Sequence, residues 1–517
     1  MSGTWGALAN TFEPENVLEP LDGGSVFEAN AGEALFLDRD YEIRKWPDFL
    51  EGQPFVRSSI DRSGIRVLQD GVIFVITPAT GNISEAATLI DAGFERVDTE
   101  RFTPFSGGIG DGRDRSDVYQ KQVQAGDEIV YGRFGVTVWS DELMPANPYE
   151  PLGSRSWEPS LQIETVDISQ ETDRHVIVSE GTEEIYEGHV DTLLMPDNET
   201  IFAAWARGHA VHVGPLARSD DGGKTWSDLI DVPDNWWDVS NTPTIHRLVD
   251  SEGVERLFVF AGGLRFPGVK MQQAVSEDSG KTWSPMKDNG LIGEVPPKDI
   301  LSVDDGKKVL MWSDRRDPTN HVWQSASYDG GLTWENERIL FKTPGIWAQP
   351  AIIRSPDGRQ WLMLMREQSR QYNALFSVSD DKGESWSEPR ELHPSLTGDR
   401  HVIRYAPDGR VVAVMRDRAG QGFDKWQSET YGHFVAWVGT YDDIIERRPG
   451  EYRIKLLHSY ANWDCGYAGF EVLPDGTFVA TTYIKYQPGP KKHSVVSTRF
   501  TLDELDKKWR EKFGNQK

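Results

Sequence analysis

Short runs of apolar residues, each followed by a tight-turn signal, dominate the chain from about residue 157 to residue 499. The runs AIIRS and WLMLMR, for example, flank the turn PDGRQ, and RLFVFAGG is a further run of this kind. Runs of this length separated by Gly, Pro and Asp predict strand, turn and strand. Helices are predicted over 84–92 and 501–513, the second opened by a Thr501-x-x-Glu504 capping box. The pattern predicts an all-β protein.

A motif present in four copies gives these strands a period. The copies are SDDGGKTW, SEDSGKTW, SYDGGLTW and SDDKGESW; their starts lie 57, 51 and 52 residues apart, at Ser219, Ser276, Ser327 and Ser379. In each copy Asp can accept backbone N–H bonds, Gly can take a positive φ and Trp can fill a hydrophobic gap, as in a turn between strands. A repeat of roughly 50 residues is typical of a four-stranded propeller blade, and residues 157–499 have room for about six. We predict a six-bladed β-propeller.

A second repeated turn locates the candidate site. It is a Pro-Asp turn that would join the first two strands of a blade, and it occurs at Asp197, Asp357, Asp408 and Asp475. The first strand of a propeller blade lines the central channel, so residues at one repeated position on it should converge. Eight positions before the four Asp residues stand His189, Gln349, Arg400 and Tyr467. Arg366 and Arg416 stand where second strands end on the same face.

Residues 1–155 do not contain the repeat. Strand-like runs such as EALFLD and GVIFVITP surround the predicted helix 84–92, so we expect a smaller, mainly β accessory domain. The segment 144–157, rich in Pro, Gly and Ser, is the predicted linker. We expect the propeller to occupy residues 156–500 and a C-terminal helix, within 501–517, to pack on it.

The charge balance narrows the range of partners. Lys and Arg number 55 and Asp and Glu 82, a formal net charge of −27, which disfavours nucleic acid and an anionic membrane surface. The single cysteine, Cys465, excludes an intramolecular disulfide framework and a Cys-rich metal site. No apolar run reaches the roughly 18 to 20 residues that span a bilayer, and the given N-terminus lacks a secretory signal pattern. We expect a soluble protein, either cytoplasmic or secreted with its signal removed.

The four S-x-D-x-G-x-[TS]-W turns are identified as the Asp boxes, or BNR repeats, of the sialidase (neuraminidase) superfamily. The resemblance implies a six-bladed propeller and a glycosidase of carbohydrate metabolism. Members of the family use three arginines to bind the substrate carboxylate, a Tyr nucleophile activated by a Glu, and an Asp acid/base. Arg366, in QPAIIRSPDGRQWLMLMR, looks like the second of those arginines, and Tyr467, in GYAGFEVLPDG, looks like the nucleophile.

The sequence also departs from the family pattern. Gln349 stands where the family has its activating Glu, and His189 stands where it has its first arginine. His209 and His212, in ARGHAVHVG, fall where the family has its acid/base Asp. The chain therefore resembles a divergent member of the superfamily.

The lead hypothesis is an exo-acting glycoside hydrolase that releases a terminal acidic sugar, sialic acid or another ulosonic or uronic acid, from a glycan, with no cofactor and no metal. The substrate carboxylate would be bound through paired hydrogen bonds. The predicted substrate-binding residues are Arg366, Arg400, Arg416 and Gln349.

The predicted catalytic residues are Tyr467, His189 and Asp191. Tyr467 would stabilise or trap the oxocarbenium centre of the reacting sugar. His189 and Asp191 are two positions apart, so on a strand both side chains face the same way and could transfer a proton together.

Two other functions remain open. A polysaccharide lyase acting on uronic-acid glycans would use His and Tyr as base and acid, and it would not need a Glu at Gln349. A non-catalytic glycan-binding propeller would bind sugar without turnover. Each site residue also has a structural interpretation: an ion pair with an acid for the arginines, a core position for Tyr467, and a hydrogen bond to a backbone carbonyl for His189.

Overall fold

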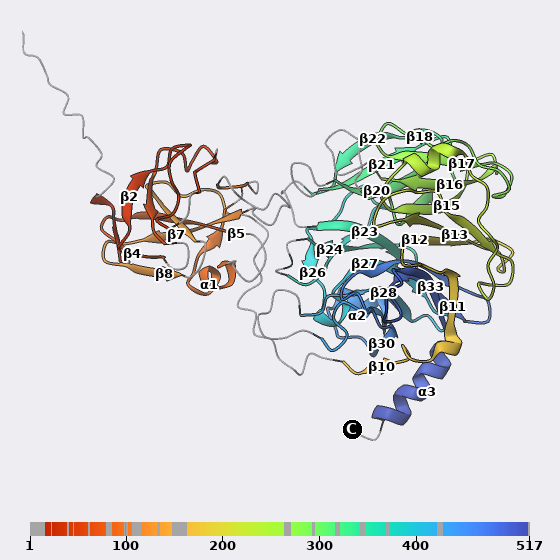
Figure 1. The fold of residues 1–517 in the computed structure, drawn as a ribbon. Coiled ribbons are helices and arrows are strands. Elements are labelled where there is room, and N and C mark those ends of the chain that lie inside the picture. Colours follow the sequence, from red (N-terminus) through yellow and green to blue (C-terminus); the bar gives the residue numbers. More distant parts are fainter. Residues whose placement is uncertain are drawn as a thin grey trace, which may run out of the picture. The chain divides into compact units, whose positions relative to one another are not determined.

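The computed structural model describes residues 16–21, 23–38, 41–44, 46–59, 63–78, 85–97, 99, 102–105, 116–131, 135–146, 163–262, 270–291, 295–315, 321–341, 347–368, 370, 372–420 and 428–514. The chain divides into two compact units, Met1–Ser156 and Trp157–Lys517, which we call the N-terminal and C-terminal units. Strands dominate both units (Figure 1), which confirms the all-β class predicted from the apolar runs.

Two antiparallel sheets form the N-terminal unit, with strand orders β2-β3-β9-β5-β7-β6 and β1-β4-β8. The central strand β5 is buried on both faces, because Ile73 and Val75 pack into one core and Phe74 and Ile76 into another. The strands are β1 (Leu18–Pro20), β2 (Ser25–Glu28), β3 (Pro54–Arg57), β4 (Ser63–Val67), β5 (Gly71–Pro78), β6 (Glu95–Arg96), β7 (Ser116–Val123), β8 (Glu128–Tyr131) and β9 (Val136–Ser140).

The described strands of the C-terminal unit form six sheets, each built from consecutive antiparallel strands. The first four sheets are β12 (Glu187–Leu194), β13 (Ile201–Arg207) and β14 (Leu216–Ser219); β15 (Pro243–Val249), β16 (Glu255–Ala261), β17 (Gln272–Ser276) and β18 (Lys287–Asp288); β19 (Ile300–Val303), β20 (Lys308–Arg315), β21 (His321–Ser327) and β22 (Glu335–Ile339); and β23 (Trp347–Arg354), β24 (Trp361–Glu367), β25 (Leu375–Ser379) and β26 (Arg390–Glu391). The last two are β27 (Gly398–Tyr405), β28 (Val411–Asp417), β29 (Phe434–Gly439) and β30 (Tyr452–Leu457), with β10 (Thr165–Asp167) added parallel to β30, and β31 (Cys465–Val472), β32 (Phe478–Ile484) and β33 (Ser494–Phe500), with β11 (His175–Ser179).

First strands of neighbouring sheets contact one another. Strand β12 contacts β15 on one side and β31 on the other, and β27 contacts both β23 and β31. The last sheet is completed by β11 from the beginning of the unit, which pairs antiparallel with β33; in Figure 1 the yellow β11 lies beside the blue β33. This pairing leaves β33 without an open edge and ties the two ends of the unit together.

The predicted Pro-Asp turns join the first two strands of four sheets. In each turn the Asp carboxylate accepts a hydrogen bond from the backbone N–H two residues later, at 2.9 to 3.1 Å, which is the contact of an Asx turn. The four residues are Asp197, Asp357, Asp408 and Asp475. These turns set the register of the first strands and so place the residues eight positions before them.

Among the described residues, three α-helices accompany the strands: α1 (Ala86–Asp91), α2 (Tyr441–Ile445) and α3 (Leu502–Phe513). The Glu504 carboxylate accepts a hydrogen bond from the backbone N–H of Thr501 at 2.9 Å, and Leu502 and Leu505 of α3 join the core of the C-terminal unit. The start of the predicted helix 84–92 at Ser84, and the predicted linker from residue 147 on, lie outside the described residues. None of the described helices is long and apolar enough to cross a membrane.

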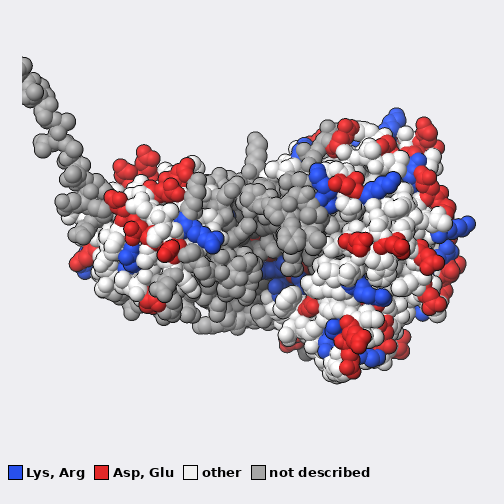
Figure 2. Space-filling model, turned by 45° about the horizontal axis from the view of Figure 1, so that its top comes forward, with Lys and Arg blue, Asp and Glu red and all other residues white. Residues whose placement is uncertain are grey.

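Acidic and basic side chains are interspersed over the surface shown in Figure 2. Ion pairs between such groups include Arg66 with Glu19 at 2.7 Å in the N-terminal unit and Arg410 with Glu451 at 2.9 Å in the C-terminal unit.

Candidate active site

The four side chains that the repeat arithmetic predicts to converge lie together in the C-terminal unit. The side-chain amide of Gln349 donates a hydrogen bond to the hydroxyl of Tyr467, and the ring centroids of Tyr467 and His189 are 4.2 Å apart. The guanidinium carbon of Arg400 is 5.4 Å from the centroid of the Tyr467 ring. All four are at most 8% exposed, so Tyr467 is the centre of a buried polar group.

An irregularity in the first strands presents these side chains. Strands β12, β23, β27 and β31 each shift register against their second strand at this point. Gln349 and Arg400 have φ angles of 53° and 54°, which residues other than glycine rarely adopt. Bulges of this kind re-aim side chains beside functional sites, and strained backbone is concentrated at such sites.

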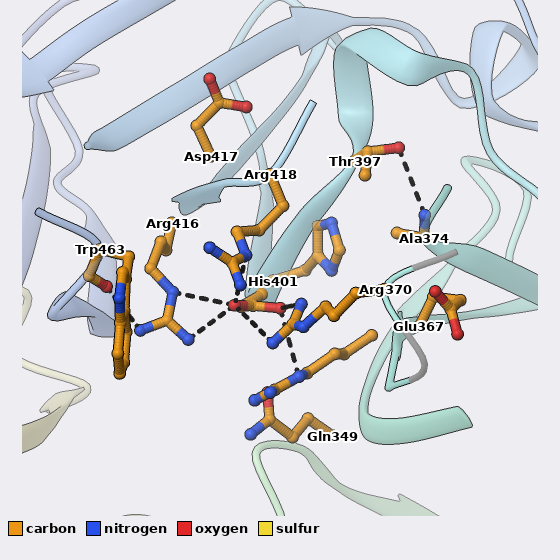
Figure 3. Close-up of polar contacts among 12 residues, drawn as sticks. Gln349, Glu367, Arg370, Ala374, Thr397, His401, Arg416, Asp417, Arg418 and Trp463 are labelled. Carbon is orange, nitrogen blue, oxygen red and sulfur yellow. Dashed lines mark hydrogen bonds and ion pairs between the residues drawn. The ribbon is translucent and has the colours of Figure 1, made fainter. Parts of the chain in front are cut away.

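Four arginines surround one buried carboxylate, that of Asp399. In Figure 3 the side chains of three of them, Arg370, Arg416 and Arg418, point toward one another. Nε and Nη2 of Arg416 lie 2.9 and 2.6 Å from Asp399 Oδ2, and Nε of Arg366 lies 3.3 Å from Oδ1. Nε of Arg418 lies 3.5 Å from Oδ2, and Arg370 donates to both carboxylate oxygens.

The cluster carries more positive charge than Asp399 can offset. Burial alone would raise the pKa of the Asp399 carboxyl, but the four arginines hold it well below its usual value. Burial and the neighbouring Arg370 lower the pKa of Arg418 to about 10. The Arg366, Arg370 and Arg418 side chains are 12%, 20% and 14% exposed, so they can meet a ligand. The arrangement suits a further anion.

The structure places two of the three predicted arginines in this cluster. Arg366 and Arg416 belong to it, whereas Arg400 donates to the carbonyl of Pro296 at 3.4 Å and lies over Tyr467. Arg416 is not paired with its neighbour Asp417, because adjacent strand residues face opposite ways. In Figure 3 Asp417 points away from Arg416.

Asp191 is bound elsewhere than at His189. Its carboxylate accepts hydrogen bonds from the Lys298 ammonium group and from backbone N–H groups, including that of Ile245 at 3.1 Å. His189 Nδ1 instead lies 3.2 Å from the hydroxyl of Thr242. Burial and the nearby His209 lower the pKa of His189 well below 6.5, so its ring is neutral at pH 7. The expected proton-sharing contact between His189 and Asp191 is not formed.

Asp464, just before β31, gathers four further side chains that the sequence reasoning did not connect. The hydroxyls of Tyr186 and Tyr483 donate to its carboxylate at 2.8 and 3.1 Å. His493 Nε2 and His209 Nδ1 lie 3.2 and 3.4 Å from its oxygens. Burial would raise the pKa of the Asp464 carboxyl, but His209, His493 and Tyr186 keep it below its usual value.

This Asp464 group adjoins the Tyr467 group, since the His189 ring centroid is 4.9 Å from that of His209. In the described part of the chain, no three His, Cys, Asp or Glu side chains are arranged to hold a metal ion. The site therefore contains two carboxylates, Asp399 among arginines and Asp464 among phenols and imidazoles, together with Tyr467 and His189.

Trp463 forms an exposed rim beside the arginine cluster. Its side chain is 53% exposed, its carbonyl accepts a hydrogen bond from Arg416 at 2.7 Å, and the Arg416 guanidinium carbon is 5.5 Å from its ring centroid. An indole face held in this way can stack on a sugar ring.

Residues 247–421 match the model of the BNR repeat-like domain. The matched segment contains the Asp boxes that begin at Ser276, Ser327 and Ser379, so the identification of these turns as BNR repeats is confirmed. No curated protein matches the sequence.

Similar solved structures include a protein of unknown function from Dyadobacter fermentans, which is 15% identical, with 63% of this chain and 98% of that chain covered and a TM-score of 0.47. A Penicillium chrysogenum α-L-arabinanase is 17% identical, with 64% and 98% covered and a TM-score of 0.45. An intramolecular trans-sialidase from Ruminococcus gnavus is 13% identical, with 64% and 97% covered and a TM-score of 0.43. These distant likenesses assign no activity to the chain. What the comparisons show for this chain is a BNR repeat-like segment over residues 247–421.

Proposed function

We propose that this protein is an exo-acting glycoside hydrolase that releases a terminal acidic sugar, sialic acid or another ulosonic or uronic acid, from a glycan. The observation that carries the proposal is the set of four arginines around Asp399, one of which, Arg416, interacts electrostatically with Tyr467. Four guanidinium groups share this one carboxylate, and those of Arg366, Arg370 and Arg418 are partly exposed. The carboxylate of the sugar would be bound by these exposed groups.

We infer that the scaffold is a six-bladed propeller. Support comes from the six sheets of the C-terminal unit, the contacts between their first strands, and the pairing of β11 with β33, which joins the beginning of the unit to its end. The spacing of the Asp boxes agrees with one blade per sheet. In this fold the bulged ends of the first strands would lie at one end of the central channel, where ligands bind.

The planar guanidinium groups of Arg366, Arg370 and Arg418 would bind the sugar carboxylate through paired hydrogen bonds. Arg416 is 5% exposed and is bonded to Asp399 and to the Trp463 carbonyl, so its role is to hold the cluster together. Arg400 would act on Tyr467 through the ring face rather than on the sugar carboxylate.

Tyr467 would stabilise or trap the oxocarbenium centre as the glycosidic bond breaks. Gln349 donates a hydrogen bond to its hydroxyl, and an amide cannot accept the phenol proton at neutral pH. The proton that the leaving oxygen needs must come from another group of the site.

A second candidate, a polysaccharide lyase acting on uronic-acid glycans, is favoured by one observation. The neutral imidazole of His189 packs against Tyr467 with ring centroids 4.2 Å apart and the ring planes tilted by 37°, so a base and a phenol acid are adjacent. In this reaction the arginine cluster would neutralise the uronate carboxylate.

Product analysis after incubation with a panel of acidic glycans tests the proposal. A hydrolase releases a saturated acidic monosaccharide and consumes one water per bond. A lyase instead releases an unsaturated product that absorbs near 235 nm, and a glycan-binding protein binds without turnover. Release of neutral sugars alone would overturn the assignment of an acidic substrate.

Arg366→Ala tests the carboxylate contact. Affinity for the released acidic sugar should fall by about 2 to 4 kcal/mol, because a charge-assisted hydrogen-bond pair is lost from a partly desolvated site. Arg359→Ala is the matched control, since Arg359 lies in the turn between β23 and β24 and its side chain is 87% exposed. Equal affinity of both variants, measured by titration calorimetry, would remove Arg366 from the site.

A further inference from the structure

The group around Asp464 contains one histidine that is open to solvent. The His209 side chain is 42% exposed, whereas that of His493, the other histidine at Asp464, is 7% exposed. The polar contacts of His209 are made through Nδ1, which lies 3.1 Å from the hydroxyl of Tyr186 and 3.4 Å from Asp464 Oδ1. One ring nitrogen is thus held against a carboxylate while the ring as a whole meets solvent.

His209 also lies beside the reacting centre. Its ring centroid is 4.9 Å from that of His189, and the His189 ring in turn packs against Tyr467. A half-exposed imidazole is here paired with a partly buried carboxylate, and only the His189 ring separates it from the candidate nucleophile Tyr467. This is the arrangement of a general acid with its orienting partner.

His493 also contacts Asp464, but its side chain is only 7% exposed, and two further histidines near this point do not have this arrangement either. His212, on the same loop, has its Nδ1 2.7 Å from the carbonyl of Trp237. His189 is buried and has its Nδ1 at the Thr242 hydroxyl. Of these four rings, His209 alone combines a carboxylate partner with exposure.

We propose that His209, oriented by Asp464, is the group that protonates the leaving oxygen of the glycoside. This assignment rests on the proposed function of the same site. The Nε2–H proton of the imidazolium passes to the glycosidic oxygen, the bond from that oxygen to the anomeric carbon breaks, and its electron pair leaves with the oxygen as an alcohol. Water then adds to the anomeric carbon and returns a proton to Nε2, so that glycoside and water give sugar and alcohol.

His209→Gln and its matched control His212→Gln test the proposal, each assayed on two substrates of the same acidic sugar. On a natural glycan, whose leaving alcohol needs a proton, His209→Gln should lower kcat/KM by about 100-fold or more. On the dinitrophenyl glycoside, whose leaving group departs without a proton, the loss should stay below about 10-fold. His212→Gln should change neither value by more than about twofold, as expected for an exposed side chain outside the site.

The results separate this proposal from the proposed function. Equal losses on the two substrates, or no loss, with an active wild-type enzyme would overturn the role of His209 alone. A wild-type enzyme that hydrolyses neither substrate would overturn the proposed function and this assignment with it. Affinity of His209→Gln for the free acidic sugar, expected to match wild type, shows that the variant has folded with its arginine cluster intact.

Asp464 is a positioning residue in this scheme, and a pH profile tests it. The charged and titratable groups near the pair are Tyr186, His189, Arg416, Tyr483 and His493. In Asp464→Asn the imidazolium loses its facing carboxylate, so kcat/KM on the natural glycan should decline at lower pH on the alkaline side than in wild type. Asp464 has several partners, so a second, milder variant is needed. Tyr186→Phe removes a single hydroxyl next to the pair of His209 and Asp464, and it should shift the same alkaline side of the pH profile of kcat/KM. Profiles unchanged in both variants would show that Asp464 does not act through His209.

Discussion

Two features recur in the sheets of the C-terminal unit. One is the Asp-box turn, and the other is the end of each first strand that carries the residue eight positions before a Pro-Asp turn, which we call the inner end. Ser, Asp, Gly and Trp recur in every Asp box, whereas the residue type differs from one inner end to the next. In all four Asp boxes the Ser hydroxyl donates to the Asp carboxylate at 2.8 or 2.9 Å and accepts a hydrogen bond from the Gly N–H at 2.8 or 2.9 Å. At the inner position the repeat carries four different side chains: His189, Gln349, Arg400 and Tyr467.

This difference separates what the fold requires from what the site requires. A turn that closes on its own hydrogen bonds works equally well in each sheet, so its residues recur. The inner positions meet one another around Tyr467, and each contributes a different group to a single site. Substitutions in the outer turns should therefore change stability, and substitutions at the inner ends should change chemistry.

Asp399→Asn is expected to have the largest effect on stability. It tests whether the ion pairs of Asp399 with its arginines stabilise the inner ends of the first strands, in contrast to the local hydrogen bonds of the Asp-box turns. The free energy of unfolding should fall by about 3 to 5 kcal/mol, because four largely buried guanidinium groups lose their shared carboxylate. Denaturant unfolding measures it. The control Asp220→Asn removes an exposed acid paired with Arg218 and should change stability by less than about 0.5 kcal/mol. Similar values for both variants would contradict the view of Asp399 as the anchor of the cluster.

Tyr467→Phe should leave the fold intact and lower kcat by about 100-fold or more, because the hydroxyl that Gln349 contacts is lost from the reacting centre. Tyr405→Phe is the matched control. That hydroxyl lies at the other end of a first strand, β27, and donates to the carbonyl of Arg354 at 2.7 Å. Steady-state kinetics on a confirmed substrate compare the two. Near-normal kcat in Tyr467→Phe would break the comparison, since an inner residue would then be structural.

Much of this contrast could be predicted from the sequence because both repeats depend on local turn chemistry. Asp, Gly and Pro at fixed offsets mark the turns, and counting from the turn gives the strand position of Tyr467 and of its three counterparts. Because the first strands β12, β23, β27 and β31 have equal lengths, the residues at this repeated position lie close to one another.

Asp399 and Asp464 could not be predicted in the same way. Asp399 directly precedes Arg400, and in a regular strand it would face away from the site; the register shift in β27 removes that alternation. Its arginine partners come from β24 and β28 and from the residues that follow these strands, and nothing along the chain marks which of many acids they share. Asp464 lies outside the repeated position, and its contacts with Tyr186 and His209 join residues far apart in sequence.

Arg418→Ala should separate binding from stability within the inner region. Arg418 has the longest of the measured ion-pair distances to Asp399, 3.5 Å, and its pKa is lowered by burial and by repulsion from Arg370. We expect KM for the acidic glycan to rise about 10-fold with kcat unchanged, because a binding contact common to ground and transition state is lost. The free energy of unfolding should fall by no more than about 0.5 kcal/mol, since removing the side chain relieves repulsion. A large loss of stability would show that the fourth arginine is a structural partner of Asp399.

Asp221→Ala is expected to have the smallest effect and tests the outer side of the comparison. Asp221 is partly buried, which raises its pKa, but hydrogen bonds from Thr225, Ser219 and Lys224 lower the pKa to about 2. At pH 7 the variant should lose about 1 kcal/mol of unfolding free energy with unchanged kcat, since a local hydrogen-bonded turn is lost far from the chemistry. A carboxyl whose pKa is lower in the folded state than in the unfolded chain stabilises the fold above the unfolded value of about 4, and this contribution disappears as the pH falls toward 2. The difference between wild type and variant, measured by denaturant unfolding, should therefore be smaller at pH 3 than at pH 7. A thousandfold loss of kcat at unchanged stability would instead place this turn in the site and erase the distinction between the two repeats.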